Sequence, residues 1–517
     1  MLLDGFLRAS AQSFPAKTAL VCAGRRLTYA WLDETTDRMA IALGRFGVRR
    51  GDRVVIHLEN SVETVLAIFA TLKAGGVFVL VNPTTKTDKL AYIVNDCQAG
   101  VLISDMRAEG TLGEVQARAP LLGTIVLVNG TGVTSTWTGT RGTVSFQALT
   151  APQPAACRAT PTRIDLDLAA IVYTSGSTGV PKGVVLSHEN MVAAATSITS
   201  YLENTADDVI LNVLPLSFDY GLYQLLMACK VGATLVLERS FVYPPVILDT
   251  LVRERVTGFP IVPTIAAMLL RHDLQSYDFS ALRYITSTGA ALPSAHIAWL
   301  RSMLPAARLY SMYGITESKR VSYLPPDQID SRPTSVGKPM PNVEVFVCDE
   351  SGQLRETGTG ELVVRGATVM QGYWGKPEES ARTLGAGRFP GERLLYTGDI
   401  FRIDDDGYLY FVSRRDDIIK SRGEKVSPRE VENVLHDLPG VIEAVVVGVP
   451  DEVLGQAIKA CVKVDPESGL SERDVASHCA QRLEDFMVPK IVEFVQAMPR
   501  TTTGKVNRRE LVARLAS

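Results

Sequence analysis

Short apolar runs alternate with longer amphipathic segments in the first part of the chain. The run DRVVIHL (52–58) is followed by SVETVLAIFATLKAG (61–75) and GVFVLVN (76–82), and AGVLISD (99–105) comes later. Continuously apolar strands joined by helices are typical of a parallel sheet that is covered on both faces. We therefore expect an α/β fold in which doubly wound sheets with helices form a large N-terminal domain.

The pattern changes near residue 413. AVVVGV (444–449) and KACVKV (459–464) predict strands, and a helical pattern precedes and follows them. A unit of roughly a hundred residues is large enough to be a domain of its own. We expect a large domain at 1–412 and a small, mobile α+β domain at 413–517.

Two predicted helices of the small domain begin with capping signals. Ser427 is the expected N-cap of the first helix, with Pro428 at the first helical position and Glu430 completing a capping box. Ser471 with Asp474 forms a second box, in which Asp replaces the usual Glu.

Length, charge and cysteine content narrow the class of protein. A chain of 517 residues is too long for one compact core. A net charge of −3 gives no electrostatic reason to expect nucleic acid as a partner. Seven cysteines without a C-x-x-C pair argue against disulfides or zinc.

The most apolar stretch is interrupted by Lys73 and a glycine pair, and the N-terminus lacks a signal-peptide core. We expect no membrane span and a cytoplasmic location.

One loop is unusually rich in Gly, Ser and Thr. YTSGSTGVPKG (173–183) lies between the apolar runs LAAIVY (168–173) and GVVLSH (183–188). Backbone N–H groups in such a loop can turn towards an anion, and Lys182 adds a positive charge. The spacing differs from a Walker A loop, because no Ser or Thr follows the lysine. The segment predicts a phosphate grip of another design.

Six motifs, in this order, resemble the family of AMP-forming adenylating enzymes, which includes acyl-CoA synthetases, peptide-synthetase adenylation domains and luciferases. They are YTSGSTGVPKG (173–183), STGAAL (287–292), YSMYGITES (310–318), YTGD (396–399), SRRDDIIKSRGEKVSPREVE (413–432) and RTTTGKVNRREL (500–511). The resemblance covers nearly the whole chain, and it implies that the large domain at 1–412 is an adenylation domain that binds ATP and an acid.

The resemblance implies a nucleotide site. The phosphate loop would comprise Thr174, Ser175, Gly176, Ser177, Thr178, Gly179 and Lys182. The adenine pocket would comprise Gly289, Ala290, Ala291, Tyr313 and Gly314. Asp399, assisted by Arg414, would bind the ribose.

The resemblance also implies catalytic roles. Thr316 would contact the α-phosphate, Glu317 would hold Mg²⁺, and Lys505 would bridge the carboxylate and α-phosphate oxygens. Asp416 would be the hinge about which the small domain rotates between the two half-reactions. Ser413 departs from the family, which usually has Gly there; this change removes no ligand. Taken one by one, these residues also have structural interpretations, for example as helix-terminal, turn or basic-tail residues.

The sequence says least about the pocket that binds the acid. Its predicted residues are Phe218, Asp219, Tyr220, Gly221, Pro263 and Thr288. The SFD sequence resembles peptide synthetases, in which an Asp pairs with the α-ammonium of an amino acid. A buried unpaired carboxylate is costly, so Asp219 is expected to have a partner, either a substrate ammonium or a protein donor. The sequence leaves both alternatives open.

The expected activity is ATP-dependent conversion of a carboxylic acid to an acyl-AMP with release of pyrophosphate, followed by transfer to a thiol. The acceptor would be CoA or the phosphopantetheine of a separate carrier protein. The alternative is an amino-acid adenylating enzyme that loads such a carrier. A binding-only protein is disfavoured because Lys505, Glu317 and Asp399 are all present. A luciferase-like oxygenation stays open.

Overall fold

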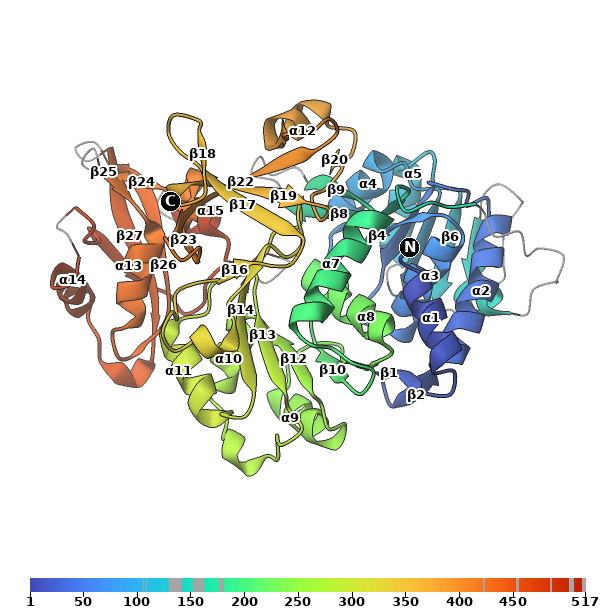
Figure 1. Cartoon of the computed structure of the whole chain (residues 1–517), viewed down its shortest axis with the longest axis horizontal. Helices are drawn as coiled ribbons and strands as arrows, with labels where there is room; N and C mark the ends of the chain where they lie inside the picture. The colour runs from blue at the N-terminus through green and yellow to red at the C-terminus, as the bar shows by residue number, and fades with distance from the viewer. Residues whose placement is uncertain are drawn as a thin grey trace.

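The structure is a computed structural model. It describes residues 1–105, 107, 109–129, 142–151, 162–175, 181–421, 424–451, 455–483, 486–501 and 506–513. Figure 1 shows four sheets within this part of the chain, three in the first 414 residues and one in the remainder.

The first sheet has eight strands and contains the apolar runs at 52–58, 76–82 and 99–105, whose pattern predicts parallel pairing. In spatial order they are β20 (Gly372–Tyr373), β9 (Pro181–Ser187), β8 (Leu168–Ser175), β4 (Val77–Leu80), β3 (Arg53–His57), β5 (Val101–Asp105), β6 (Thr124–Val128) and β7 (Gly142–Ser145). The strands from β8 to β7 are parallel, as predicted, whereas β9 and β20 pair antiparallel at one edge.

The second sheet has nine strands. In spatial order they are β16 (Lys338–Pro339), β15 (Ser322–Tyr323), β14 (Arg308–Tyr313), β13 (Tyr284–Ser287), β12 (Gly258–Ile261), β10 (Val209–Asn212), β11 (Thr234–Leu237), β1 (Thr18–Cys22) and β2 (Arg25–Thr28). Its central strands are parallel, and β2, β15 and β16 are antiparallel. Parallel pairing aligns the C-terminal ends of β10, β12, β13 and β14 along one side of the sheet. We call this side the carboxyl edge, and the opposite side, where these strands begin, the amino edge.

Helices cover both sheets. They are α1 (Gly5–Ser13), α2 (Tyr29–Arg45), α3 (Val62–Lys73), α4 (Thr87–Asp96), α5 (Glu109–Arg118), α6 (Phe146–Thr150), α7 (His188–Tyr201), α8 (Asp219–Val231), α9 (Pro244–Arg253), α10 (Pro263–Leu269) and α11 (Ser294–Met303). Green in Figure 1, α7 and α8 lie between the two sheets. α8 is buried around nearly its whole circumference, whereas α7 leaves Glu189, Thr196 and Ser200 exposed along one face.

A third, antiparallel sheet follows. It contains β18 (Leu354–Arg355), β17 (Val343–Cys348), β19 (Gly358–Gly366), β22 (Arg393–Ile403), β21 (Leu384–Ala386) and β23 (Leu409–Arg414), and α12 (Pro377–Thr383) accompanies it. The expected boundary at 412/413 falls within β23 and stays a prediction.

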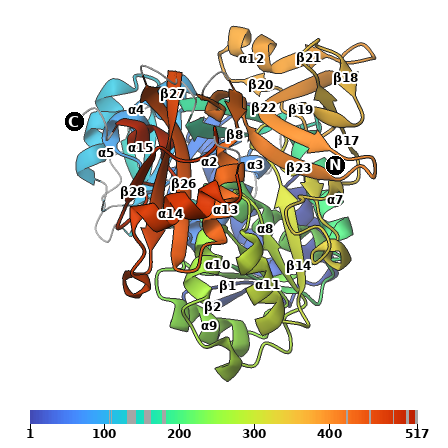
Figure 2. The ribbon, with the colours of Figure 1, turned by 90° about the vertical axis from the view of Figure 1, so that its left-hand side faces the viewer.

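The last part of the chain folds around its own sheet (Figure 2). Its elements are β24 (Ile419–Ser421), β25 (Glu424–Val426), α13 (Pro428–His436), β26 (Val441–Asp451), β27 (Gly455–Val464), α14 (Glu472–Ala480), β28 (Ile491–Phe494) and α15 (Arg508–Ala513). Alternate residues of β26 face opposite sides, so Val446 joins one hydrophobic cluster and Val445 another.

Ser427 is the N-cap residue of α13 and Pro428 begins the helix, as predicted, but the predicted capping box is wrong. Ser427 makes no side-chain cap at α13; its hydroxyl donates instead to the carbonyl oxygen of Val412. The tertiary contact with the preceding strand competes successfully for that hydroxyl. Ser471 and Asp474 form the predicted reciprocal box at α14, which is confirmed.

Candidate active site

The carboxyl edge of the nine-stranded sheet carries most of the predicted site residues. Thr288 and Gly289 follow β13, Gly314 follows β14, and Asp219 opens α8 after β10. Ligands of open α/β sheets bind at this edge, where the loops after successive strands meet. Motifs that are far apart in the sequence thereby become neighbours.

Tyr313, Asp399 and Arg414 meet although they come from three different strands. The hydroxyl of Tyr313 donates to Asp399 Oδ2 at 2.6 Å, and Arg414 Nε lies 3.2 Å from Asp399 Oδ1. Asp399 is 3% exposed. Burial raises the pKa of Tyr313, and the charge of Asp399 raises it further. The tyrosine therefore stays a hydrogen-bond donor to the carboxylate at neutral pH.

Tyr373 connects two other predicted residues and was not itself predicted from the sequence. Its hydroxyl donates to Glu317 Oε1 at 2.9 Å, and Lys182 Nζ lies 5.4 Å from the centre of its ring. Burial raises the pKa of Tyr373, as does the charge of Glu317. One aromatic side chain thus contacts both the lysine of the phosphate loop and the carboxylate of the acidic motif. No local pattern around Tyr373 signals this role.

The phosphate loop begins and ends on one hairpin. Thr174 of β8 is paired with Lys182 of β9 in the antiparallel register. Gly176, Ser177, Thr178, Gly179 and Lys505 lie outside the described residues, as do the side chains of Ser175 and Asp416.

A magnesium ion fits Glu317 only together with a nucleotide. Within the described ranges there is no group of three or more His, Cys, Asp or Glu side chains that could hold a metal ion. Mg²⁺ is usually bound by one or two carboxylates, water and substrate phosphates rather than by an all-protein cage. A single carboxylate near the phosphate lysine is compatible with that mode.

A cavity of about 40 Å³ lies at the same edge. Its wall includes four predicted substrate residues, namely Phe218, Asp219, Tyr220 and Thr288. It also includes Thr316, Gly289 and Gly314, so it adjoins the residues expected to meet the nucleotide. Tyr223, Lys319 and Arg320 line it as well and were not predicted.

Asp219 has a partner within the protein. Its Oδ2 lies 3.6 Å from Lys319 Nζ, an ion pair just longer than a hydrogen bond. The Lys319 side chain is 1% exposed, and burial lowers its pKa while Asp219 and Glu317 act in the opposite direction. The expectation that Asp219 is paired is therefore met by a protein cation.

Two predicted substrate residues serve the framework instead of lining this cavity. A Cβ at Gly221 would lie 2.4 Å from the carbonyl oxygen of Pro215, so only glycine allows α8 to approach that turn. Pro263 occupies the first turn of α10, where its fixed φ suits a helix start.

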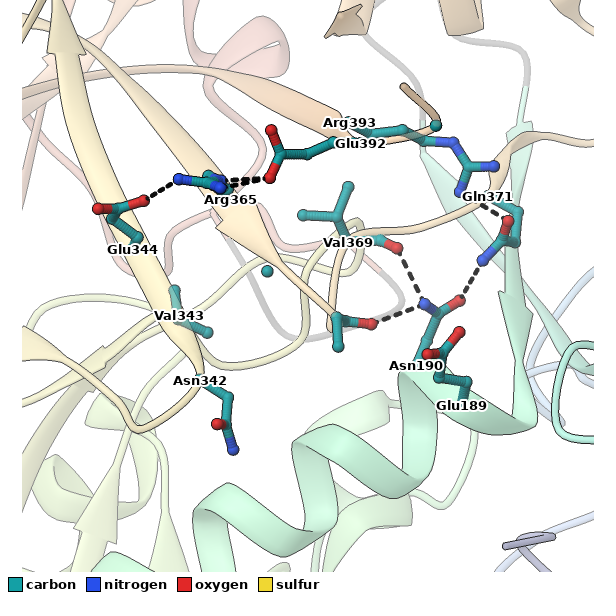
Figure 3. A pocket seen from close by; sticks show the side chains of 13 residues that line it. Glu189, Asn190, Asn342, Val343, Glu344, Arg365, Val369, Gln371, Glu392 and Arg393 are labelled. Carbon is teal, nitrogen blue, oxygen red and sulfur yellow. Dashed lines mark hydrogen bonds and ion pairs between the residues drawn. The ribbon is translucent and has the colours of Figure 1, made fainter. Parts of the chain in front are cut away.

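A larger cavity, of about 590 Å³, lies beside the start of α7 and strands β17, β19 and β22 (Figure 3). Several of its polar groups are paired with one another. Arg365 pairs with Glu344 and Glu392 at 2.7 and 2.5 Å, and Arg393 donates to Gln371 at 2.6 Å. The two pairs of Arg365 join β19 to β17 and to the start of β22 in the cavity wall.

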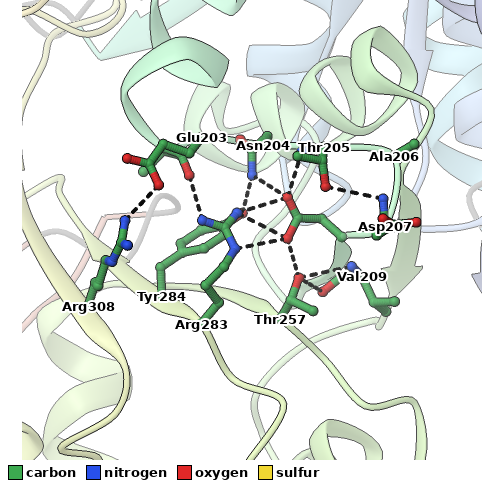
Figure 4. Close-up of polar contacts among 12 residues, drawn as sticks. Glu203, Asn204, Thr205, Ala206, Asp207, Val209, Thr257, Arg283, Tyr284 and Arg308 are labelled. Atoms are coloured by element: carbon green, nitrogen blue, oxygen red, sulfur yellow. Dashed lines mark hydrogen bonds and ion pairs between the residues drawn. The ribbon is translucent and has the colours of Figure 1, made fainter.

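The amino edge of the nine-stranded sheet is closed by a polar network (Figure 4). Asp208, which is 3% exposed, lies 2.9 Å from Arg283 Nη2. It also accepts hydrogen bonds from Thr257, Thr205 and Asn204 at 2.7, 2.9 and 3.1 Å. These residues precede or flank β10, β12 and β13, so the network fixes the strands at the end opposite the cavity.

The last segment of the chain reaches the wall of the candidate site. Arg500 donates to Thr264 Oγ1 at 3.3 Å and pairs with Glu443 at 2.6 Å. Arg500, which contacts α10, also forms a β-bridge with Val506.

Two family models match the chain. The model described as AMP-binding enzyme matches residues 7–374, and the model described as AMP-binding enzyme C-terminal domain matches residues 430–505. The chain belongs to the AMP-binding enzyme family. This AMP-binding enzyme is an AMP-forming acid–thiol ligase of the adenylate-forming group, as the resemblance implied, and it has the fold of that group.

Relatives of this AMP-binding enzyme include ligases and synthetase modules. A long-chain-fatty-acid–CoA ligase of Bacillus subtilis is 31% identical over 99% of this chain and 94% of its own length. A linear gramicidin synthase of Brevibacillus parabrevis is 30% identical over 97% of this chain but only 9% of its own length. The structure of the anthranilate CoA ligase AuaEII in complex with anthranoyl-AMP has a TM-score of 0.89 at 30% identity, covering 100% of this chain and 97% of that chain.

None of the helices in the described part of this AMP-binding enzyme is long and apolar enough to cross a membrane.

Proposed function

We propose that the protein converts one carboxylic acid to its acyl-adenylate with ATP, releases pyrophosphate, and transfers the acyl group to the thiol of CoA or of a separate carrier protein. The observation that carries this proposal is the convergence of a nucleotide cluster, a phosphate cluster and an acid cavity around the end of β14 and the loop that follows it, with Asp399 and Lys182 contributed by the two other sheets of the large domain. Tyr313 with Asp399, Lys182 with Glu317, and the cavity beside Thr316 supply the three parts.

Asp399 is the proposed ribose ligand. Both of its oxygens can accept hydrogen bonds, and Tyr313 and Arg414 hold the carboxylate in place. The ring of Tyr313, fixed by that bond and by an edge contact with Phe401, would present a face to adenine together with Gly289, Ala290 and Ala291. Gly314 would let the loop approach the nucleotide closely.

The chemistry requires an anion to approach an anion. Two unit charges about 4 Å apart repel by about 1 kcal/mol in water and by about 4 kcal/mol at an effective dielectric constant of about 20. The acid is already ionised, so the protein needs no general base; it must neutralise charge and align the reactants. Lys182 and the loop of Thr174, Ser175 and Thr178 would hold the β- and γ-phosphates.

Three further groups would act at the reacting phosphate. Glu317 would hold Mg²⁺, which offsets phosphate charge when bound. Thr316 would donate to the α-phosphate, and Lys505 would bridge the α-phosphate and the acid. Lysine suits a bridging position because its charge is compact and its stem is long.

We propose that the thioester step follows rotation of the small domain about Asp416. The contact of Arg500 with Thr264 of α10 supports an adenylation-competent arrangement in this structure. The CoA-ligase relatives favour CoA as acceptor, and the similarity to a gramicidin synthase favours a carrier protein as the alternative acceptor.

The amino-acid alternative rests on Asp219. Its ion pair with Lys319 weighs against an ammonium role, because a substrate ammonium would have to share one carboxylate with a buried lysine. An amine-free acid is therefore the first candidate.

The test is acid-dependent exchange between ATP and pyrophosphate across amino acids, aliphatic acids and aryl acids, followed by each half-reaction in variants. Lys505→Ala is expected to lower adenylation by several orders of magnitude and barely to change thioester formation from supplied acyl-AMP. Arg473→Ala, which removes a cation from α14, is the matched control and should change neither. Equal losses in both half-reactions for Lys505→Ala would contradict the proposed role.

A further inference from the structure

The acid cavity has more positive than negative side chains in its wall. Lys319 and Arg320 line it and are 6% and 5% exposed, whereas Asp219 is the single carboxylate in the described lining. Glu317, whose charge also acts on Lys319, lies outside this lining and accepts the Tyr373 hydroxyl. The wall therefore has a formal excess of one positive charge.

Lys319 is held in the cavity by an unusual backbone. Its φ is +62°, in the left-handed region that a residue with a Cβ rarely adopts. The loop after β14 folds back so tightly that a Cβ at Gly314 would lie 2.1 Å from the carbonyl oxygen of Lys319. Backbone strain of this kind is concentrated at functional sites, where the surrounding structure maintains it.

Several donors in the wall have no acceptor. Lys319 Nζ, Arg320 Nε, Tyr223 Oη and Thr288 Oγ1 are all buried and without a hydrogen-bond partner within the described ranges. The guanidinium of Arg320 lies over the ring of Tyr220 at 4.9 Å, a contact that offsets charge only in part. Buried donors are normally paired, because an unpaired one keeps the full cost of losing its water. Their concentration in one cavity indicates a ligand that brings acceptors.

The size of the cavity limits that ligand. A single water needs roughly 10–15 Å³ of such volume, so about 40 Å³ accommodates only a few water-sized groups. Phe218 and Tyr220 close the wall with rings at 6.1 Å in an edge contact. A short acyl group fits this space, and a long alkyl chain would require these rings to move.

We propose that the acid is a short dicarboxylic acid, whose second carboxylate binds Lys319 and the neighbouring hydroxyls of Tyr223 and Thr288. This inference rests on the proposed function. The reacting carboxylate would face Thr316 at the nucleotide side, while the second one neutralises the excess charge of the wall. Asp219 then orients Lys319 and does not touch the substrate.

The experiment is ATP–pyrophosphate exchange with pairs of acids of equal chain length, one with a single carboxylate and one with two, from three to six carbons. Amino acids and hydroxy acids of the same length complete the panel. We expect kcat/KM about 100-fold higher for a short dicarboxylic acid than for its matched monocarboxylic acid. That ratio corresponds to about 2.7 kcal/mol, which lies within the range of a charge-assisted bond to Lys319.

Two variants separate recognition from folding. Lys319→Met keeps the volume and removes the charge, and it should abolish the dicarboxylate preference by raising KM for the diacid while leaving KM for ATP unchanged. The double variant Lys319→Met with Asp219→Asn removes both charges, avoids an unpaired buried carboxylate, and should behave in the same way. Lys319→Arg should retain part of the preference.

The outcomes are distinguishable. Exchange with monocarboxylic acids or amino acids alone, or equal losses for mono- and diacids in both variants, would overturn this inference and leave the proposed function standing. Absence of exchange with every acid, in protein that still binds ATP, would overturn the proposed function and this inference with it.

Discussion

Individual side chains in the candidate site are held by partners from distant segments. Asp399 is the clearest case, because Tyr313 of β14 and Arg414 of β23 converge on its two oxygens. A carboxylate that is buried, ionised and fixed from both sides is ready to accept two ligand hydroxyls without reorganisation. The same arrangement means that a neutral amide at this position would lose charge-assisted bonds.

Asp399→Asn is expected to raise KM for ATP by about 10- to 100-fold, since hydrogen bonds to a charged group are worth about 1.5–3 kcal/mol. Exchange kinetics with varied ATP measure this effect. Asp405→Asn, in the turn after β22, is the matched control and should leave KM for ATP unchanged. An unaltered KM in Asp399→Asn would show that the ribose is bound elsewhere.

At the scale of elements, the two edges of the nine-stranded sheet are used differently. The carboxyl edge carries the cavity with its unpaired donors, and the amino edge carries the Asp208 network, in which both oxygens of Asp208 are paired (Figure 4). Burial alone would raise the pKa of Asp208, but hydrogen bonds from Thr257, Thr205 and Asn204 and the charge of Arg283 lower it below its ordinary value of 3.8. This network stabilises the strands and has no part in the proposed chemistry.

Asp208→Asn is expected to destabilise the large domain by about 3 kcal/mol, because removing one partner of a buried ion pair leaves the other uncompensated. Since the folded-state pKa of Asp208 is lowered, its contribution is present above the ordinary pKa and is lost as the pH falls through the folded-state value. Urea unfolding of both proteins at neutral pH and below pH 3.8 should therefore give a difference that shrinks in acid. The exposed neighbour Asp207→Asn should show neither effect.

At the scale of the whole molecule, the C-terminal segment contacts the large domain next to the site. Arg500 bridges Glu443 and Thr264, and it forms a β-bridge with Val506. A contact of this kind favours one relative position of the two domains, although its residues do not touch the substrate. Its energy is small because both charged groups are partly exposed, at 32% and 25%.

Arg500→Ala is expected to slow adenylation by a few-fold, in line with an exposed pair worth up to about 1 kcal/mol, and to leave thioester formation from supplied acyl-AMP unchanged or faster. Separate assays of the two half-reactions measure this split. Arg473→Ala on α14 serves again as the control. A parallel decline of both half-reactions would mean that Arg500 supports folding rather than domain position.

The sequence alone determined the family, the α/β class and the order of the motifs, because these depend on local residue types, spacing and periodicity. The paired capping box at Ser471 belongs to the same category, since both partners lie within one helical turn. Local signals failed where a distant group competed, as at Ser427, whose hydroxyl bonds to Val412.

The tertiary structure alone decided which residues meet. Lys319 and Asp219 are a hundred positions apart, and only the left-handed turn at Lys319 and the alignment of parallel strands bring them together. Tyr373 reaches Glu317 and Lys182 in the same way, from a short strand at the edge of the eight-stranded sheet. Side-chain pairing across such distances is set by packing and by the cost of unpaired buried charge. The pattern of residues along the chain does not indicate which of these side chains pair.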